Sequence, residues 1–130
     1  MSGEVQLVML AGAGGALGAG LRHLVNVVTV KTFGLGVPWA TLSVNVAGSF
    51  IMGCLAAYLL GRMPEAVGLR IFLGTGILGG FTTFSAFSLD AVQLFEQGAT
   101  WPLAAYILAS VGLSVLGCLG GLLAMRAVLA

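Results

Sequence analysis

Charge is scarce in this chain of 130 residues. Charged side chains make up 7% of the sequence and hydrophobic residues 59%, whereas ordinary soluble domains carry roughly 25% charged residues. A soluble protein of this size could not hide so much apolar surface from water. The few charges are also too few to form the polar outer face that a soluble helical bundle needs. The composition therefore predicts a protein that is embedded in a membrane.

Other scarcities exclude further classes of function. The formal net charge is +1, so no basic surface is present that would hold nucleic acid. The two cysteines, Cys54 and Cys118, lie in apolar segments without metal-binding spacing or a nearby histidine, and we expect both to be buried free thiols. The first ten residues lack the basic region of a signal peptide, so we expect the first apolar stretch to be retained.

Charges, glycines and prolines divide the chain into four apolar segments. These segments cover residues 5–30, 39–61, 66–95 and 101–129, and each is longer than the roughly 20 residues that cross a bilayer. The connections between them are short and leave no room for a domain outside the membrane. We therefore expect a single all-α membrane domain with four transmembrane helices, whose function lies within the bilayer.

The orientation of the chain is weakly specified by its charges. An even number of spans places both termini on one side, together with Arg62, Arg70 and Arg126, while Arg22 and Lys31 fall on the other side. Cytoplasmic loops normally carry a clear excess of lysine and arginine. Three basic residues on one side against two on the other hardly decide the orientation. Either other cues orient the chain, or it inserts both ways, which would allow identical chains to pair antiparallel.

Glycine is abundant, with 21 residues, and it gathers in two runs within the apolar segments. These runs are GAGGALGAG at positions 12–20 and GCLGG at positions 117–121. Small residues allow transmembrane helices to approach one another closely, so both runs predict helix-packing surfaces. A phosphate-binding loop is not indicated, because neither a strand nor a suitable lysine accompanies the glycines.

Two stripes of polar side chains run through the apolar segments, each with residues at i, i+4 and i+8. They comprise Thr41, Asn45 and Ser49 in the second segment and Tyr106, Ser110 and Ser114 in the fourth. This spacing keeps each stripe on one face of its helix. Interhelical hydrogen bonds would explain either stripe alone. Two such stripes in so small a protein favour a path for a polar species.

The available chemistry indicates which species could follow that path. The acids and bases of the sequence map to the ends of spans or to connections, whereas a proton-coupled transporter normally needs an ionisable group within the membrane. This distribution argues for passive conduction. The donors within the spans are hydroxyl groups, one side-chain amide and the backbone, and a small anion of high charge density would gain most from them.

The stretch GGFTTFSAF, at positions 79–87, is the most irregular part of any span. We expect a helix break at Gly79 and Gly80, and such a break is tolerated at membrane depth only where it is buried in protein or lines a cavity. Carbonyl groups freed there can coordinate Na⁺. Phe84 shares a helix face with both Phe81 and Phe87, and the positive edges of these rings could face an anion. Ordinary lipid-facing or core phenylalanines are the alternative.

At these residues the chain resembles the fluoride channels of the Fluc/CrcB family, over nearly its whole length. Each span carries one of the family's motifs, here GAGGALGAGLRH, ATLSVNVAGSF, GILGGFTTFSAFSLD and YILASVGLS. The third motif is highly specific. Ala86 departs from the family pattern, in which threonine often stands at this position, and we expect altered local packing without loss of function.

The resemblance implies a passive, fluoride-selective channel that exports fluoride across the inner membrane. It implies an antiparallel, dual-topology homodimer with two pores and a third helix that is broken in mid-membrane. A structural sodium ion would lie at the dimer centre on the backbone carbonyls of Gly79 and Thr82, with no organic cofactor. The residues that the resemblance places along the fluoride path are Arg22, Asn45, Thr83, Phe84, Phe87, Tyr106, Ser110 and Ser114.

Three other classes of function fit the sequence less well. A small four-span multidrug exporter should have a carboxylate deep in its first span, where this chain has only Glu4 at the edge. A non-transporting assembly subunit would explain the glycine runs but not the polar stripes. An enzyme is least supported, because the spans show no nucleophile–base pair and no cluster of metal ligands.

Overall fold

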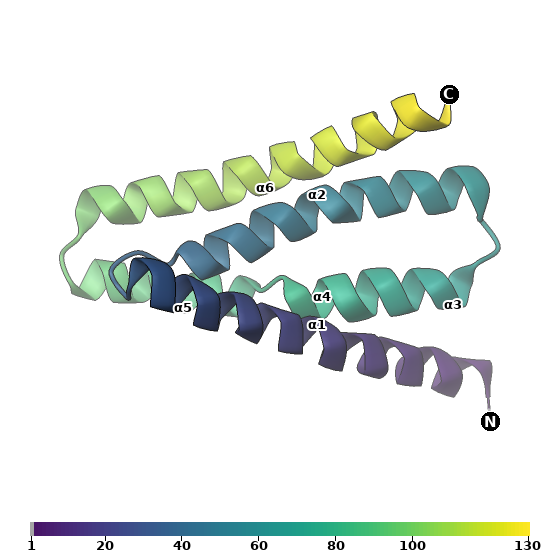
Figure 1. Ribbon diagram of the computed structural model, residues 1–130, viewed down its shortest axis with the longest axis horizontal. Helices are drawn as coiled ribbons and strands as arrows, with labels where there is room; N and C mark the ends of the chain where they lie inside the picture. Colours follow the sequence, from purple (N-terminus) through teal and green to yellow (C-terminus); the bar gives the residue numbers. More distant parts are fainter. Residues whose placement is uncertain (1) are drawn as a thin grey trace.

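The computed structural model describes residues 2–130, which form a bundle of long helices (Figure 1). The elements are α1 (Gly3–Phe33), α2 (Trp39–Arg62), α3 (Val67–Arg70), the π-helical segment η1 (Ile71–Leu78), α4 (Gly79–Phe81), α5 (Phe84–Glu96) and α6 (Thr100–Leu129). The prediction of four spans is confirmed, because four helical stretches are long and apolar enough to cross a membrane. These stretches are Gly3–Phe33, Trp39–Arg62, Val67–Glu96 and Thr100–Leu129.

The helix ends follow from local sequence. The Ser2 hydroxyl accepts a hydrogen bond from the Val5 amide at 3.4 Å and caps the start of α1, as serine commonly does at this position. Gly34 ends α1 with a φ of 78°, and Gly98 turns the chain between α5 and α6 with a φ of 69°. Both angles lie in the left-handed region that favours glycine.

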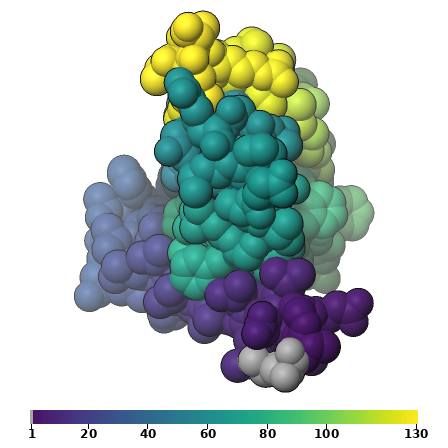
Figure 2. Space-filling model, turned by 90° about the vertical axis from the view of Figure 1, so that its right-hand side faces the viewer, coloured from purple at the N-terminus to yellow at the C-terminus, as the bar shows by residue number. Residues whose placement is uncertain are grey.

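Both chain termini lie at the same end of the bundle as the connection between α2 and α3 (Figure 1). Figure 2, which views the molecule from this end, shows the start of α1 below, the α2–α3 connection in the middle and the end of α6 above. Two arginines hold this end together. Arg62 donates from Nη2 to the Leu129 carbonyl at 3.4 Å, and Arg70 donates to the Pro64 carbonyl at 2.8 Å.

Glycines bring α2 and α6 into close contact. A Cβ atom at Gly53 would collide with the Cys118 carbonyl, and one at Gly121 would collide with the Phe50 carbonyl. The predicted packing role of the GCLGG run is therefore confirmed for Gly121. Cys54 and Cys118 lie near this contact as free, half-buried thiols. The prediction of free thiols is therefore confirmed, and that of buried thiols holds in part.

The third span packs along α1 through a second set of glycines. A Cβ atom at Gly14 would collide with the Phe72 carbonyl, and one at Gly18 would collide with the Ile77 carbonyl. The facing segment, η1, is wound as a π-helix, and the Gly79 amide that follows it bonds to the Gly74 carbonyl. No feature of the sequence indicated this wider winding.

The bundle has a small core and a largely apolar surface. Val44 and Leu59 are the large side chains that are almost completely buried, whereas Val8, Leu108 and Val128 are among many large apolar side chains that are exposed. A soluble monomer rarely exposes such extensive apolar surface. Such a surface fits the four apolar helical stretches that are long enough to cross a membrane.

Candidate functional site

The third span is interrupted at two threonines. Thr82 and Thr83 have extended conformations, with φ/ψ of −85°/159° and −155°/122°, and helical structure resumes at Phe84. The prediction that Gly79 and Gly80 would form the break was wrong. Gly79 is helical, with φ/ψ of −63°/−38°. The prediction that Phe81 shares a helix face with Phe84 was also wrong, because the interruption separates them.

Gly80 is instead required for close packing. A Cβ atom at this position would lie 2.5 Å from the Gly15 carbonyl oxygen and 3.0 Å from the Ala19 amide nitrogen, both on α1. The carbonyl group of Gly80 accepts a 3.1 Å hydrogen bond from Nε of Arg22. Arg22 is thereby attached to the segment just before the interruption.

The two threonines use their hydroxyl groups differently. The Thr82 hydroxyl donates back to the Leu78 carbonyl at 2.9 Å and so completes the preceding helical turn. The Thr83 hydroxyl accepts from the Ala86 amide at 3.1 Å and caps the start of α5. An N-cap threonine satisfies one of the amide groups that a helix start leaves without a partner.

Asn45 on α2 holds the interruption from the side. Its Oδ1 accepts from the Thr83 amide at 2.7 Å, and its Nδ2 donates to the Thr83 carbonyl at 2.9 Å. The side-chain amide therefore replaces the helical partners of one residue. It still has a second Nδ2 hydrogen available as a donor.

Most of the predicted fluoride-path residues line one cleft of about 300 Å³, which we call the serine cleft. Its walls come from α2, from the interruption, from α5 and from α6. The lining residues are Asn45, Ser49, Thr82, Thr83, Phe84, Phe87, Ser110, Val111, Ser114 and Val115. The structure thus brings two residues of each polar stripe together with the irregular stretch, while Thr41 and Tyr106 lie outside this cleft.

Three aromatic rings form a row beside the serine cleft. The ring centroids of Phe84 and Phe87 are 5.4 Å apart, and those of Phe87 and Tyr106 are 5.3 Å apart. Phe87 is 9% exposed and lies within the subunit, whereas Phe84 is 77% exposed. Tyr106 is buried behind Phe87 and does not line the serine cleft.

The hydroxyl groups of Ser110 and Ser114 are buried and, within residues 2–130, have no hydrogen-bond partner. Other helical hydroxyls of this protein bond to the carbonyl four residues earlier, as Ser43 does to Trp39 and Ser88 does to Phe84. A buried hydroxyl without a partner costs roughly 1–3 kcal/mol. Both serines belong to the lining of the serine cleft, and buried hydroxyls without partners beside a cleft are candidate donors for a polar ligand.

A second cleft of about 370 Å³, the arginine cleft, lies on the other side of the interruption. It is lined by Ala19, Arg22, His23, Asn26, Ala40, Thr41, Val44, Thr83, Ala86 and Asp90. Thr83 lines both clefts. Arg22 therefore lies next to the interruption and lines a different cleft from the serines of α6.

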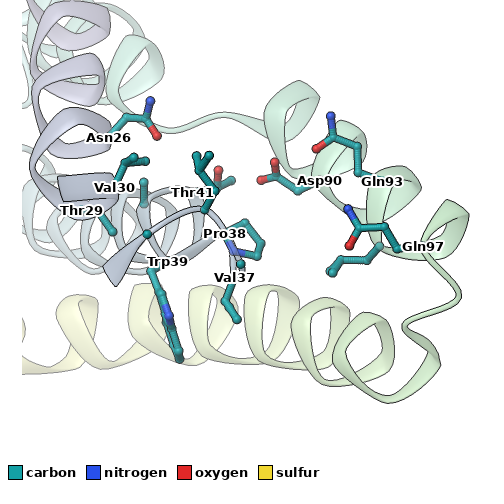
Figure 3. Close-up of a pocket in the computed structure, with 15 residues that line it drawn as sticks. Asn26, Thr29, Val30, Val37, Pro38, Trp39, Thr41, Asp90, Gln93 and Gln97 are labelled. Atoms are coloured by element: carbon teal, nitrogen blue, oxygen red, sulfur yellow. The ribbon is translucent and has the colours of Figure 1, made fainter. Parts of the chain in front are cut away.

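The arginine cleft continues toward the end of the bundle opposite the termini. A third cleft of about 180 Å³ shares Asn26, Thr41 and Asp90 with it and is also lined by the α1–α2 loop. Figure 3 shows Thr41 and Asp90 with their oxygen atoms turned toward one another, while the Trp39 side chain points away. Polar groups therefore line a route from this end of the bundle to Thr83.

Asp90 is a site residue that the sequence analysis placed only at the end of a span. Its Oδ2 accepts a 2.8 Å hydrogen bond from the Tyr106 hydroxyl. A signal that could have identified it is its position three residues after Phe87, which puts both residues on one helix face. The identity of its partner on α6 depends on tertiary packing.

Comparison with known proteins identifies the family of the chain. The model of the family "CrcB-like protein, Camphor Resistance (CrcB)" matches residues 9–122. A protein of Rhizobium meliloti (strain 1021) named "Fluoride-specific ion channel FluC" is 53% identical over 120 residues, which cover 92% of this chain and 96% of that protein. A protein of the same name from Agrobacterium fabrum (strain C58 / ATCC 33970) is 48% identical, over 88% of this chain and 92% of its own length. Another, from Rhodopseudomonas palustris (strain BisB5), is 46% identical, over 92% of this chain and 97% of its own length. Matches of this extent show that the chain belongs to the CrcB family.

Proposed function

We propose that this protein is a passive channel for fluoride, and not an enzyme, and that the anion passes along the serine cleft. The observation that carries the proposal is the pair of unpartnered hydroxyls of Ser110 and Ser114 in a cleft that Asn45 and Phe87 also line. The names of the relatives supply the identity of the ion, because they are fluoride-specific ion channels.

The chemistry of the serine cleft suits a small anion. Fluoride must exchange its hydration shell for protein donors, and the two serine hydroxyls and the spare Nδ2 hydrogen of Asn45 are such donors. A phenylalanine ring presents a positive edge, which adds weak attraction along the row of Phe84 and Phe87. Neutral donors bind firmly enough to replace water and weakly enough to release the ion, as conduction requires.

Passive conduction would export fluoride from the cell across the inner membrane. In acid surroundings neutral HF crosses lipid, and the anion that it forms in a more neutral cytoplasm is trapped there. A pore lets the anion leave down its gradient. No proton carrier within the membrane is needed for this direction of flow.

The isolated subunit leaves the proposed path open on one side. Phe84, which lines the serine cleft, is 77% exposed, and the cleft is open to the surface. We infer that an antiparallel second copy covers this face and completes each of two pores. Arg62, Arg70 and Arg126 lie at one end of the bundle and Lys31 at the other, with Arg22 beside the interruption. So few basic residues specify the orientation only weakly, which allows insertion both ways.

A structural sodium ion at the dimer centre is part of the proposal, and the residues fit it. In a continuous helix the Thr83 amide would bond to the Gly79 carbonyl and the Ala86 amide to the Thr82 carbonyl. Here these amides bond to side chains instead. Freed carbonyls of an interrupted transmembrane helix are suitable Na⁺ ligands.

The test is anion efflux from liposomes that contain the purified protein. Fluoride and chloride efflux are measured with ion-selective electrodes at neutral pH, beside protein-free liposomes. We expect rapid fluoride efflux and chloride efflux near the protein-free rate. Equal rates for both anions would exclude fluoride selectivity, and no fluoride efflux from liposomes with correctly folded protein would refute the proposal.

A further inference from the structure

We propose that Asn45 and the Thr83 hydroxyl are positioning residues for the cation, because they take the two amide hydrogens that would otherwise occupy the carbonyl groups of Gly79 and Thr82. The inference rests on the sodium site of the proposed function. It assigns to these two side chains the role of holding that site open before the ion arrives.

The first step concerns the Gly79 carbonyl. An α-helix pairs each amide with the carbonyl four residues earlier, so the helical donor for Gly79 is the Thr83 amide. That amide donates to Oδ1 of Asn45 at 2.7 Å. The extended conformation of Thr82, with a ψ of 159°, turns the Thr83 amide away from the preceding turn, and the amide bonds to Asn45 on α2.

The second step concerns the Thr82 carbonyl. Its helical donor would be the Ala86 amide, which donates to the Thr83 hydroxyl at 3.1 Å. The cap that starts α5 therefore also prevents the helix from closing onto Thr82. One asparagine and one threonine divert the donors of the two carbonyls that the sodium proposal requires.

The third step concerns direction. The amide and carbonyl groups of a trans peptide point in opposite directions, and no cis peptide bond occurs in residues 2–130. Since Asn45 holds the Thr83 amide, the Thr82 carbonyl of the same peptide plane points away from Asn45. The Nδ2 bond of Asn45 to the Thr83 carbonyl holds the next peptide plane as well.

The carbonyl of Gly80, which lies between the two, is treated differently. It accepts the Nε hydrogen of Arg22 at 3.1 Å. This carbonyl is therefore already bonded to a cationic side chain and is a poor candidate for a metal ligand. Side chains from α1 and α2 thus decide which carbonyls near the interruption remain available.

The first experiment compares Thr83→Val with Thr83→Ser. The valine variant keeps the side-chain shape and loses the acceptor, whereas the serine variant keeps the acceptor. The readout is the Na⁺ concentration at half-maximal protection of the purified protein against thermal unfolding, with N-methylglucamine replacing Na⁺ at constant ionic strength. Removing a group that orients a metal ligand typically weakens affinity by about 10–100-fold.

We expect Thr83→Val to raise the Na⁺ midpoint at least about tenfold and Thr83→Ser to leave it near the wild-type value. Asn45→Ala should move the midpoint in the same direction as Thr83→Val. A folded Thr83→Val protein with the wild-type Na⁺ midpoint would overturn the proposal. So would a Thr83→Ser protein as impaired as the valine variant, because the hydroxyl would then not be the relevant group.

The second measurement needs no variant. Hydrogen exchange of the Thr83 and Ala86 amides is followed by NMR in wild-type protein with and without Na⁺. Both amides should stay protected in the absence of Na⁺ if the side chains hold them; free exchange without Na⁺ would show that the ion orders the site instead. A wild-type protein whose thermal stability ignores Na⁺ would remove both the sodium site and this inference, while fluoride efflux would still test conduction separately.

Discussion

The hydroxyl group of Tyr106 on α6 donates a 2.8 Å hydrogen bond to Asp90 on α5. The centroid of the Tyr106 ring lies 5.3 Å from that of Phe87, which is also on α5. These two contacts join α5, which begins at the interruption, to α6, which carries Ser110 and Ser114. The position of Phe87 beside the serine cleft therefore depends on a hydrogen bond between two residues that do not line this cleft.

Tyr106→Phe should lower the thermal stability of the protein and its fluoride efflux. The substitution keeps the ring beside Phe87 but leaves the half-buried Asp90 carboxylate without its donor, at a cost of about 1–3 kcal/mol. Thermal unfolding in detergent and liposome efflux measure the two effects. Tyr58→Phe is the control, since the Tyr58 ring is 41% exposed on α2; an equal loss in both variants would contradict a specific role for the Tyr106 bond.

Ser110→Ala and Ser114→Ala should separate function from stability. Each removes a buried hydroxyl that has no partner in the described chain, so thermal stability should stay the same or rise by up to about 1–3 kcal/mol. Fluoride efflux should fall, because the cleft loses a donor. Ser43→Ala, which removes a hydroxyl already bonded to the Trp39 carbonyl, should leave efflux unchanged. Destabilised serine-to-alanine variants with normal efflux would show that the stripe is structural.

Phe84→Ile should sharply reduce fluoride efflux while the protein remains folded. The ring is 77% exposed in the subunit and contributes little to its core, but isoleucine lacks the positive ring edge that we place along the path. Phe95→Ile is a matched control on α5, where the Phe95 ring is 72% exposed. The ring-edge argument fails if the Phe84 variant conducts like wild type.

Gly18→Ala should destabilise the contact between α1 and the third span. Its Cβ atom would collide with the Ile77 carbonyl, whereas a Cβ atom at Gly15 meets nothing within 4 Å in the subunit. Forcing a methyl group into a packed contact costs about 1–3 kcal/mol, while alanine in an open helix position gains up to about 1 kcal/mol. Thermal unfolding of Gly18→Ala and Gly15→Ala should therefore shift in opposite directions. Equal shifts would refute the assigned contact.

Sequence alone determined the membrane setting, the four spans and the family. Long apolar runs and polar residues at i, i+4 and i+8 are local properties of the chain, and helix geometry converts them directly into spans and faces. For the same reason the polar stripes and the irregular third span could be identified before any packing was known.

Tertiary structure alone decided where the third span is interrupted and what the interruption does. The sequence pointed to Gly79 and Gly80, but Gly80 lies against α1, and the interruption falls at Thr82 and Thr83. Asn45 reaches Thr83 across 38 positions of sequence. The Asn45 side chain competes with the helix for the amide hydrogen of Thr83. A local sequence pattern cannot predict this competition, because it depends on how α2 packs against the third span.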